Sequence, residues 1–366
     1  MTGWSKTFPP CKRNMSKATN IESLPDELIS EILVRLPAQD LYDSTRLVCR
    51  KWYNMISTRN FKYSHLQRST PGLLAVNRWR GKQALMTMQN GRVEISTWSY
   101  GLGCIVESCC NGLLLEFHVN SKKRYIANPV TKQYFALPPF LGKVTAREMF
   151  SLTYAASSRA YKVVCASYSD RDRDLVCAIM TVGVDTDWRR RVSTQHLSLE
   201  AKEIFLGFPL TTRGFVHWVR NDCFEYVVSM DVESEIITQI PGPCLHHDRE
   251  SFWSSYLPME SYLSLFIGRR GKFSIDVWVM MKPETREWTK MRSIDLEPQK
   301  VPKISGYLRH LMPSGWSNNR EVLFFYHMGN FLACNVNTLE IDFYELQHFF
   351  VGNFLYDHRN SLVWLD

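Results

Sequence analysis

The chain has 366 residues and a formal net charge of +8. Its length allows a small module beside one large domain with a substantial core. No apolar run approaches the ~18 residues of a membrane span, and the N-terminus lacks the apolar stretch of a secretory signal. These features favour a two-domain protein of the cytoplasm, the nucleus or both, and they argue against a membrane partner.

The positive charge is not gathered into one surface. Residues 1–20 carry four basic side chains and no acidic one, residues 21–68 have a net charge of +1, and the remaining +3 is spread over residues 69–366. Nucleic-acid binders more often show a basic stripe or cluster. We therefore expect a disordered basic tail at residues 1–20 and no nucleic-acid partner.

Cysteine and glycine motifs give no sign of a cofactor. The ten cysteines include no C-x-x-C pair or cysteine–histidine ladder, so the spacing predicts reduced thiols and no metal site. The nucleophile-elbow pattern, the phosphate-binding loop and a complete dinucleotide fingerprint are also missing. His246-His247 is interpreted as exposed polar surface in a loop. The sequence predicts no cofactor and no catalytic residues.

Residues 22–56 form the most distinctive stretch. Apolar residues recur at helical spacing from Leu28 to Leu36, between Pro25, which suits a first helical turn, and Pro37, which ends the run. A second helix is predicted from about Leu41 to Ile56. A unit below ~70 residues seldom hides this much apolar surface, so the surplus must meet something else. It could meet a partner protein or the chain's own C-terminal domain, and periodicity alone leaves both open.

The residue pattern resembles an F-box. It runs Leu-Pro-x-x-Leu, Ile-Leu-x-x-Leu-Pro, Asp-Leu and Val-Cys-Arg-x-Trp between residues 24 and 52. The resemblance implies a three-helix module and connector at residues 21–68, which binds a SKP-family linker protein and through it a cullin. Each signature residue could either contact the linker or support the helical core. By position, the linker-binding candidates are Leu24, Pro25, Leu28, Ile32, Leu36, Leu41, Val48, Cys49 and Trp52.

From about Ser69 onward, short runs of β-branched and aromatic residues replace helical periodicity. Polar turns recur among them at an even spacing of about 50 residues, which is typical of four-stranded propeller blades. We expect an all-β propeller of about six kelch-like blades over residues 69–366; the alternative is a sandwich or an irregular β fold. The turns are marked by Thr131, Thr186, Ser234, Thr285 and Thr338.

A second resemblance covers most of residues 70–350. Cys110-Asn111-Gly112, Asn128-Pro129 and Gly214-Phe215-Val216-His217-Trp218 are similar to the plant F-box-associated domain. The Asn-Gly and Asn-Pro pairs are interpreted as turn formers and not as binding residues. Connector residues Phe61, Tyr63 and Leu66 are expected to pack on the propeller. Five tryptophans are candidate target anchors or blade-packing residues: Trp79, Trp98, Trp253, Trp316 and Trp364.

Together these features predict an α+β multidomain protein, with an F-box followed by a propeller. The resemblances imply a non-catalytic substrate adaptor of a cullin–RING ubiquitin ligase, whose propeller binds an unidentified target protein. Two alternatives stay open. One is a linker-binding scaffold outside a ligase, and the other is a propeller enzyme or small-ligand sensor.

Overall fold

The structure is a computed structural model. It describes residues 24–77, 82–89, 92–99, 104–140, 147–169, 174–192, 194, 196–205, 207–220, 223–243, 252–259, 261–269, 274–281, 285–296, 312–317, 321–327, 330–345 and 354–365. The basic tail predicted at residues 1–20 and the His246-His247 pair lie outside these ranges.

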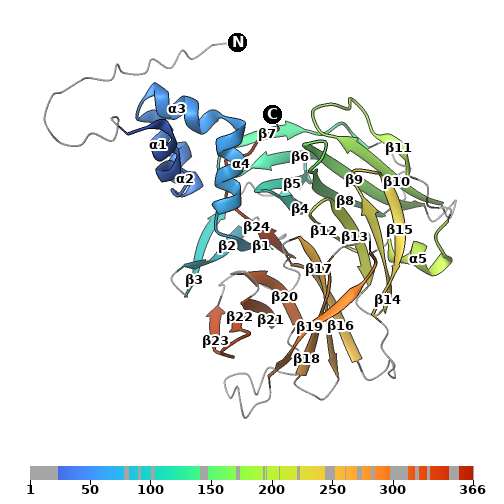
Figure 1. The fold of residues 1–366 in the computed structure, drawn as a ribbon. Coiled ribbons are helices and arrows are strands. Elements are labelled where there is room, and N and C mark those ends of the chain that lie inside the picture. The colour runs from blue at the N-terminus through green and yellow to red at the C-terminus, as the bar shows by residue number, and fades with distance from the viewer. Residues whose placement is uncertain are drawn as a thin grey trace, which may run out of the picture.

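A small helical module precedes the strands (Figure 1). Pro25 and Pro37 each stand immediately before a helix, where a missing N–H costs nothing. The module contains α1 (Asp26–Leu33), α2 (Ala38–Asp43), the 3-10 turn η2 (Thr45–Leu47), α3 (Arg50–Ser57) and α4 (Arg59–Arg68).

The continuous second helix predicted from Leu41 to Ile56 is wrong. Ser44 leaves the helical region, and its Oγ donates to Asp40 O at 2.9 Å, which ends α2. Cys49 is extended, with φ of −157°, so α3 starts only after it. Hydrophobic periodicity survives these interruptions, and for that reason it did not reveal them.

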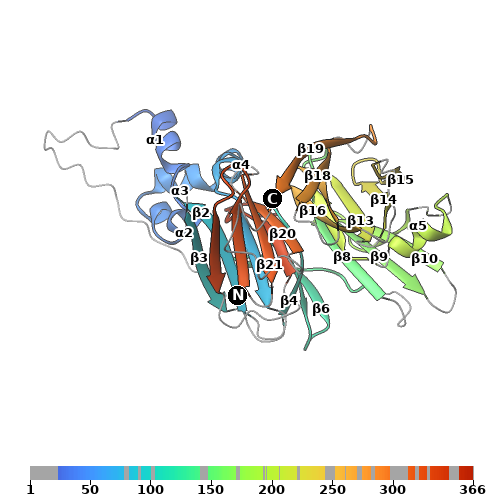
Figure 2. The ribbon, with the colours of Figure 1, turned by 90° about the horizontal axis from the view of Figure 1, so that it is seen from below.

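The rest of the described chain forms six four-stranded antiparallel sheets, which are the blades of a propeller (Figure 2). Their first strands contact one another in a closed ring around the centre. Blade 1 is β24 (Phe354–His358), β1 (Gly72–Asn77), β2 (Lys82–Gln89) and β3 (Arg92–Ser99). Blade 2 is β4 (Cys104–Cys110), β5 (Leu113–His118), β6 (Lys123–Asn128) and β7 (Gln133–Ala136). Blade 3 is β8 (Arg147–Ala155), β9 (Ala160–Ser169), β10 (Asp174–Thr181) and β11 (Arg189–Val192).

The short helix α5 (Leu199–Ile204) connects blade 3 to blade 4. Blade 4 is β12 (Pro209–Thr212), β13 (Phe215–Arg220), β14 (Cys223–Asp231) and β15 (Ile236–Pro241). Blade 5 is β16 (Phe252–Met259), β17 (Tyr262–Arg269), β18 (Ser274–Met280) and β19 (Trp288–Asp295). Blade 6 is β20 (Met312–Ser317), β21 (Val322–His327), β22 (Asn330–Asn335) and β23 (Ile341–Glu345). The expected six-bladed propeller is confirmed, whereas its kelch-like character stays a prediction.

Blade 1 is assembled from both ends of the domain. Its first strand, β24, comes from the C-terminal end of the chain and pairs antiparallel with β1, from Gly72 opposite His358 to Val76 opposite Phe354 (Figure 1). The pairing closes the ring, because the last strand completes the sheet that the first strand began. The Tyr356 hydroxyl also donates to Val106 O of blade 2 at 2.8 Å.

The five turn markers all lie between the third and fourth strands of their blades, as the spacing predicted. In blade 2, Asn128 Oδ1 accepts the N–H groups of Val130 and Thr131, and in blade 6 Asn335 Oδ1 accepts those of Asn337 and Thr338. A residue with positive φ follows the marker in four blades: Lys132, Glu235, Arg286 and Leu339. The corresponding turn of blade 1, residues 90 and 91, lies outside the described residues.

Buried apolar clusters lie between neighbouring blades. Trp218 of blade 4 and Ile179 of blade 3 belong to one such cluster, and Phe266 of blade 5 and Phe325 of blade 6 belong to another. Burying these surfaces supplies the main favourable term for the fold. Within the described residues, no helix is both long enough and apolar enough to cross a membrane.

Candidate docking surfaces of the helical module and the propeller

Helix α1 has two apolar faces, and only one of them is buried. Ile29 and Leu33 are fully enclosed in the module core. Leu28 and Ile32, four residues apart on another face, are 51% and 43% exposed. An exposed apolar row on a short helix is a candidate contact for another protein.

A second pair of exposed apolar side chains lies at the end of η2. Leu47 is 43% exposed and Val48 is 56% exposed. Lys51 in the first turn of α3 forms a 2.5 Å ion pair with Asp26 in the first turn of α1, which joins the two helix starts. We call Pro25, Leu28, Ile32, Leu47 and Val48 the docking stripe. Leu47 was missed from sequence because it lies off the face of the helix that was predicted there.

The remaining predicted candidates support the module from inside. Leu24, Leu36 and Trp52 are half-buried and pack on its core, whereas Leu41 and Cys49 are buried. Of the nine predicted residues, the structure therefore exposes four (Pro25, Leu28, Ile32 and Val48) and turns five inward. Contact with a linker stays a prediction for all nine.

Helix α4 fastens the module to the propeller. Phe61 joins the module core, and Leu66 packs with Phe150 and Leu152 of blade 3. Tyr63 lies against Tyr154, with ring centroids 5.7 Å apart. The predicted packing on the propeller is confirmed for Tyr63 and Leu66. Phe61 lies mainly among module residues and shares its cluster with Val130 of the propeller.

Buried His65 strengthens this joint. Burial lowers the pKa of its imidazole, which favours the neutral ring, although the bond to Leu36 opposes the shift. Because a carbonyl only accepts, the ring donates Nε2–H to Leu36 O at 2.9 Å. The bond ties α4 to the segment between α1 and α2.

The end of the chain lies between the two domains. Asn128 Nδ2 donates to Ser361 O at 3.1 Å and to Val363 O at 2.7 Å, and the Ser361 hydroxyl donates to Asn111 O at 2.8 Å. Leu362 packs in one cluster with Phe61 of the module and Val130 of the propeller. We call residues 359–365 the tail clamp.

The Asn-Gly and Asn-Pro pairs are therefore turn formers with a second role. Asn111 and Gly112 both have positive φ, as expected of turn residues. A Cβ on Gly112 would lie 2.4 Å from Arg359 O, so only glycine lets the tail clamp approach there. The sequence revealed the turns, which are local, but not the tail that they hold.

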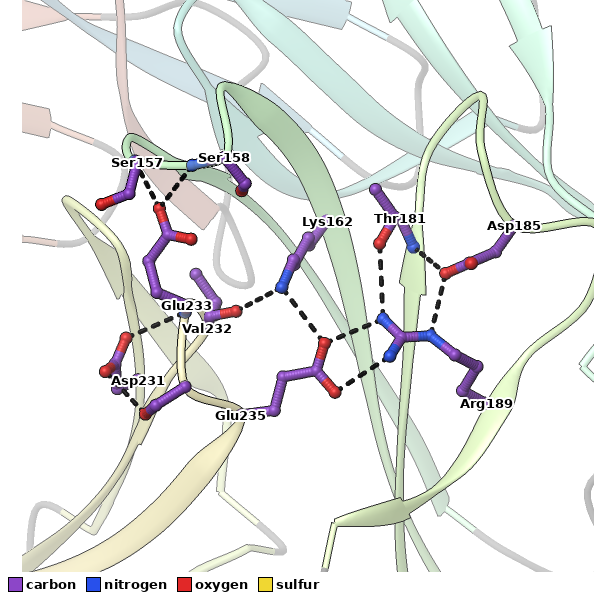
Figure 3. Close-up of polar contacts among 11 residues, drawn as sticks. Ser157, Ser158, Lys162, Thr181, Asp185, Arg189, Asp231, Val232, Glu233 and Glu235 are labelled. Atoms are coloured by element: carbon purple, nitrogen blue, oxygen red, sulfur yellow. Dashed lines mark hydrogen bonds and ion pairs between the residues drawn. The ribbon is translucent and has the colours of Figure 1, made fainter.

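The propeller end that carries the helices is named the helix face, and the opposite end the far face. Arg59 Nη2 donates to Arg159 O in the turn between β8 and β9, which places that turn on the helix face. A charged network braces blades 3 and 4 through turns on this side (Figure 3). Lys162 Nζ donates to Val232 O at 2.6 Å and contacts Glu235, which Arg189 also holds through two hydrogen bonds of 2.8 and 3.1 Å.

A cavity of about 1020 Å³ follows the centre of the ring. Side chains of α4, including Arg59 and Tyr63, line it together with the first strands of the blades. Three acidic residues line it: Asp357, and Glu107 and Glu148, which pair with Arg124 at 2.9 and 3.5 Å. The cavity could accept a peptide or a small molecule.

The tryptophans divide as follows. Trp316 is buried between blades, and Trp253 packs on the same cluster, so both serve blade packing. Trp364 is half-buried on the cluster beside α4. Trp79 and the side chain of Trp98 lie outside the described residues. None of the three described tryptophans is exposed enough to serve as an anchor for a target protein.

One group of ligand-type side chains was not predicted. Cys104, Glu116 and His118 approach one another on blade 2, with one potential ligand atom from each within 4.8 Å of the others. Cysteine spacing could not reveal this group because its members lie on two strands, and strand pairing brings Cys104 opposite His118.

Comparison with known proteins agrees with both domains. Residues 21–64 match the F-box domain family, and residues 80–345 match the F-box associated beta propeller domain family. F-box protein At5g49610 of Arabidopsis thaliana is 25% identical over 293 residues, covering 74% of this chain and 79% of that protein. F-box protein At3g08750 of the same plant is 47% identical over 58 residues, or 15% of each chain.

Among solved structures, an oligogalacturonate lyase in complex with manganese matches with a TM-score of 0.40 and 11% identity, covering 73% of this chain and 74% of that one. A likeness at this level has no bearing on the chemistry of the present chain.

Proposed function

Because the chain belongs to the F-box associated β-propeller family of plant F-box proteins, we propose that it is a substrate-recognition adaptor of a cullin–RING ubiquitin ligase. The docking stripe binds a SKP-family linker, and through it a cullin. The propeller holds a target protein within reach of a ubiquitin-charged enzyme. The adaptor itself supplies proximity and no reacting group.

The observation that carries this proposal is the docking stripe on a module fixed to the propeller. Four of its residues are more than two-fifths exposed: Leu28, Ile32, Leu47 and Val48. Burying a fully exposed side chain of this kind contributes roughly 1.5–3 kcal/mol, so covering these half-exposed side chains contributes about half of that for each. The tail clamp and α4 then hold the target-binding domain in a fixed position relative to the linker.

We further propose that the target binds the far face, in the cytoplasm or the nucleus. The helix face is partly covered by α4 and the tail clamp. The fourth strands of the blades run away from that face and end at the far face, and binding residues concentrate in the loops beyond strand ends. The chemistry of the target stays open.

The first experiment measures linker binding with a Leu28→Ala/Val48→Ala variant. We expect at least a tenfold loss of affinity for a SKP-family linker, with unfolding unchanged because both side chains are exposed. The matched control is Val184→Ala/Leu199→Ala, which removes side chains that are 72% and 79% exposed on the propeller. This control should bind like the parent.

Equal binding of the linker by the parent and the Leu28→Ala/Val48→Ala variant would show that the docking stripe is not the linker-binding surface. Linker binding without co-purification of a cullin would favour the scaffold function. A metabolite found in the central cavity of purified protein would favour the sensor.

A further inference from the structure

The Cys104, Glu116 and His118 group lies on the far face of blade 2. Cys104 is the first residue of β4, and His118 is the last residue of β5, directly opposite it. Glu116 is paired with Val106 in the next row of the same sheet face. All three side chains therefore belong to one side of one blade.

This side of blade 2 packs against blade 1. Val106 and Leu114, which share the face of Glu116, pack with Leu74 and Leu85 of blade 1. Glu116 is fully buried in this layer, whereas Cys104 and His118 are partly exposed. A small ion could therefore reach the group from the far face.

The carboxylate of Glu116 is unsatisfied. Both of its oxygens, and Nε2 of His118, are buried and have no hydrogen-bond partner among the residues that the structure describes. Burial of an unpaired carboxylate is strongly unfavourable unless it stays protonated or gains a cation. Burial raises the pKa of Glu116 to about 7 and lowers the pKa of His118, which favours a neutral imidazole with a free lone pair.

The distances between the ligand atoms suit tetrahedral coordination of one metal ion. Zinc bonds of 2.0–2.2 Å to nitrogen and oxygen place neighbouring ligand atoms roughly 3.4 Å apart. Nε2 of His118 and Oε2 of Glu116 are 3.6 Å apart. The Cys104 sulfur lies within 4.8 Å of a ligand atom of each of the other two residues, so a small approach completes the set.

We propose that Cys104, Glu116 and His118 bind one divalent transition-metal ion of the zinc class. A thiolate, an imidazole and a carboxylate are ligands that zinc accepts, and the mixed set disfavours magnesium and calcium, which prefer oxygen alone. Coordination releases to solvent the Cys104 thiol proton and any proton that Glu116 carries, because both groups bind the ion as anions. Three protein ligands leave a fourth position for water or for a donor atom from a bound partner.

The consequence for the molecule is local. The ion neutralises the buried charge between blades 1 and 2 and links the two strands β4 and β5 at their far-face ends. It also adds a Lewis-acidic position to the surface on which we propose that targets bind. The metal site itself does not depend on linker binding, so the two proposals can fail separately.

Cobalt titration of the full-length protein, first stripped with a chelator, tests the site. We expect one equivalent of Co²⁺ to produce a thiolate-to-cobalt charge-transfer band. The band should vanish in Cys104→Ser and persist in Cys110→Ser, a matched control at the other end of β4. Loss in both variants, or an unchanged band in Cys104→Ser, would overturn the proposal.

The isosteric Glu116→Gln variant provides a second readout that does not rely on the thiol. It should lower zinc affinity at least tenfold. In the metal-free state its Tm should equal or exceed that of the parent, because the unpaired acid is gone. Zinc should raise the Tm of the parent but not that of the variant. A parent that binds no more zinc than the variant would mean that Glu116 is only a protonated core residue.

Discussion

At the scale of single residues, two buried histidines make the stability of the fold depend on pH. His217 in blade 4 is fully buried between two hydroxyls, with Nε2 2.8 Å from Thr212 Oγ1 and Nδ1 2.7 Å from Ser229 Oγ. Burial lowers its pKa to about 3. His358 in β24 is also enclosed, and burial lowers its pKa to about 4, although its bond to Asn360 opposes the shift.

Acidification should therefore weaken the fold. Both folded-state pKa values lie below the ordinary 6.5, so the unfolded chain binds more protons as the pH falls. The stabilisation is complete above about pH 6.5 and declines through the acidic range. From pH 7 to pH 5 each histidine should contribute a loss of about 2 kcal/mol. Glu116, whose pKa burial raises to about 7, opposes this loss over the same range, because its folded form binds more protons than the unfolded chain does. Urea unfolding at a series of pH values measures this loss.

His217→Gln separates the two contributions, because glutamine keeps hydrogen-bonding atoms but does not titrate. It should remove the contribution of His217, about 2 kcal/mol between pH 7 and pH 5, and leave the contributions of His358 and Glu116. An unaltered slope in this variant would show that His217 does not control the response.

The environment of a single residue could be predicted from the sequence only where its cause is local. The exposed Leu28 and Ile32 follow from helical spacing. Leu41 in α2 and Cys49 immediately before α3 carry the same signature, yet both are buried. The proximity of Cys104 to His118 depends on strand pairing, which no local pattern records.

At the scale of elements, one kind of turn recurs between the third and fourth strands, and in blade 2 it also holds the tail clamp. Asn128 and Asn335 both accept two backbone N–H groups at the start of their turns. Asn128 is fully buried and also donates to two carbonyls of the tail clamp. The even spacing of these turns predicted the blades, because turn chemistry is local. It could not predict which turn would hold the C-terminus.

The two asparagines form a matched pair for mutation. Asn335→Ala should cost about 1 kcal/mol of unfolding free energy, since it removes only the turn bonds. Asn128→Ala should cost about 3 kcal/mol, because two further buried hydrogen bonds are lost and two carbonyls are left unpaired. Denaturant unfolding gives both values. Equal costs would show that the bonds to the tail clamp contribute little to stability.

At the scale of the whole molecule, the C-terminus has two separate structural roles. β24 closes the ring against β1, and the tail clamp beyond it joins the propeller to the helical module. Neither role could be predicted from the sequence, because each depends on contacts between residues more than 200 positions apart. An adaptor that works by proximity depends on this joint, since a loose module would spread the target over many positions.

Removing residues 361–366 should loosen the joint without opening the ring. β24 remains, so amide exchange in the blade strands should stay slow. Exchange in α4 should accelerate, because Leu362 and Val363 no longer pack beside Phe61 and Leu66. Linker affinity should be unchanged, since the docking stripe keeps every residue. Removal of Asp366 alone is the control. Faster exchange throughout the blades would instead show that the clamp and the ring unfold as one unit, so that the module and the propeller could not move independently.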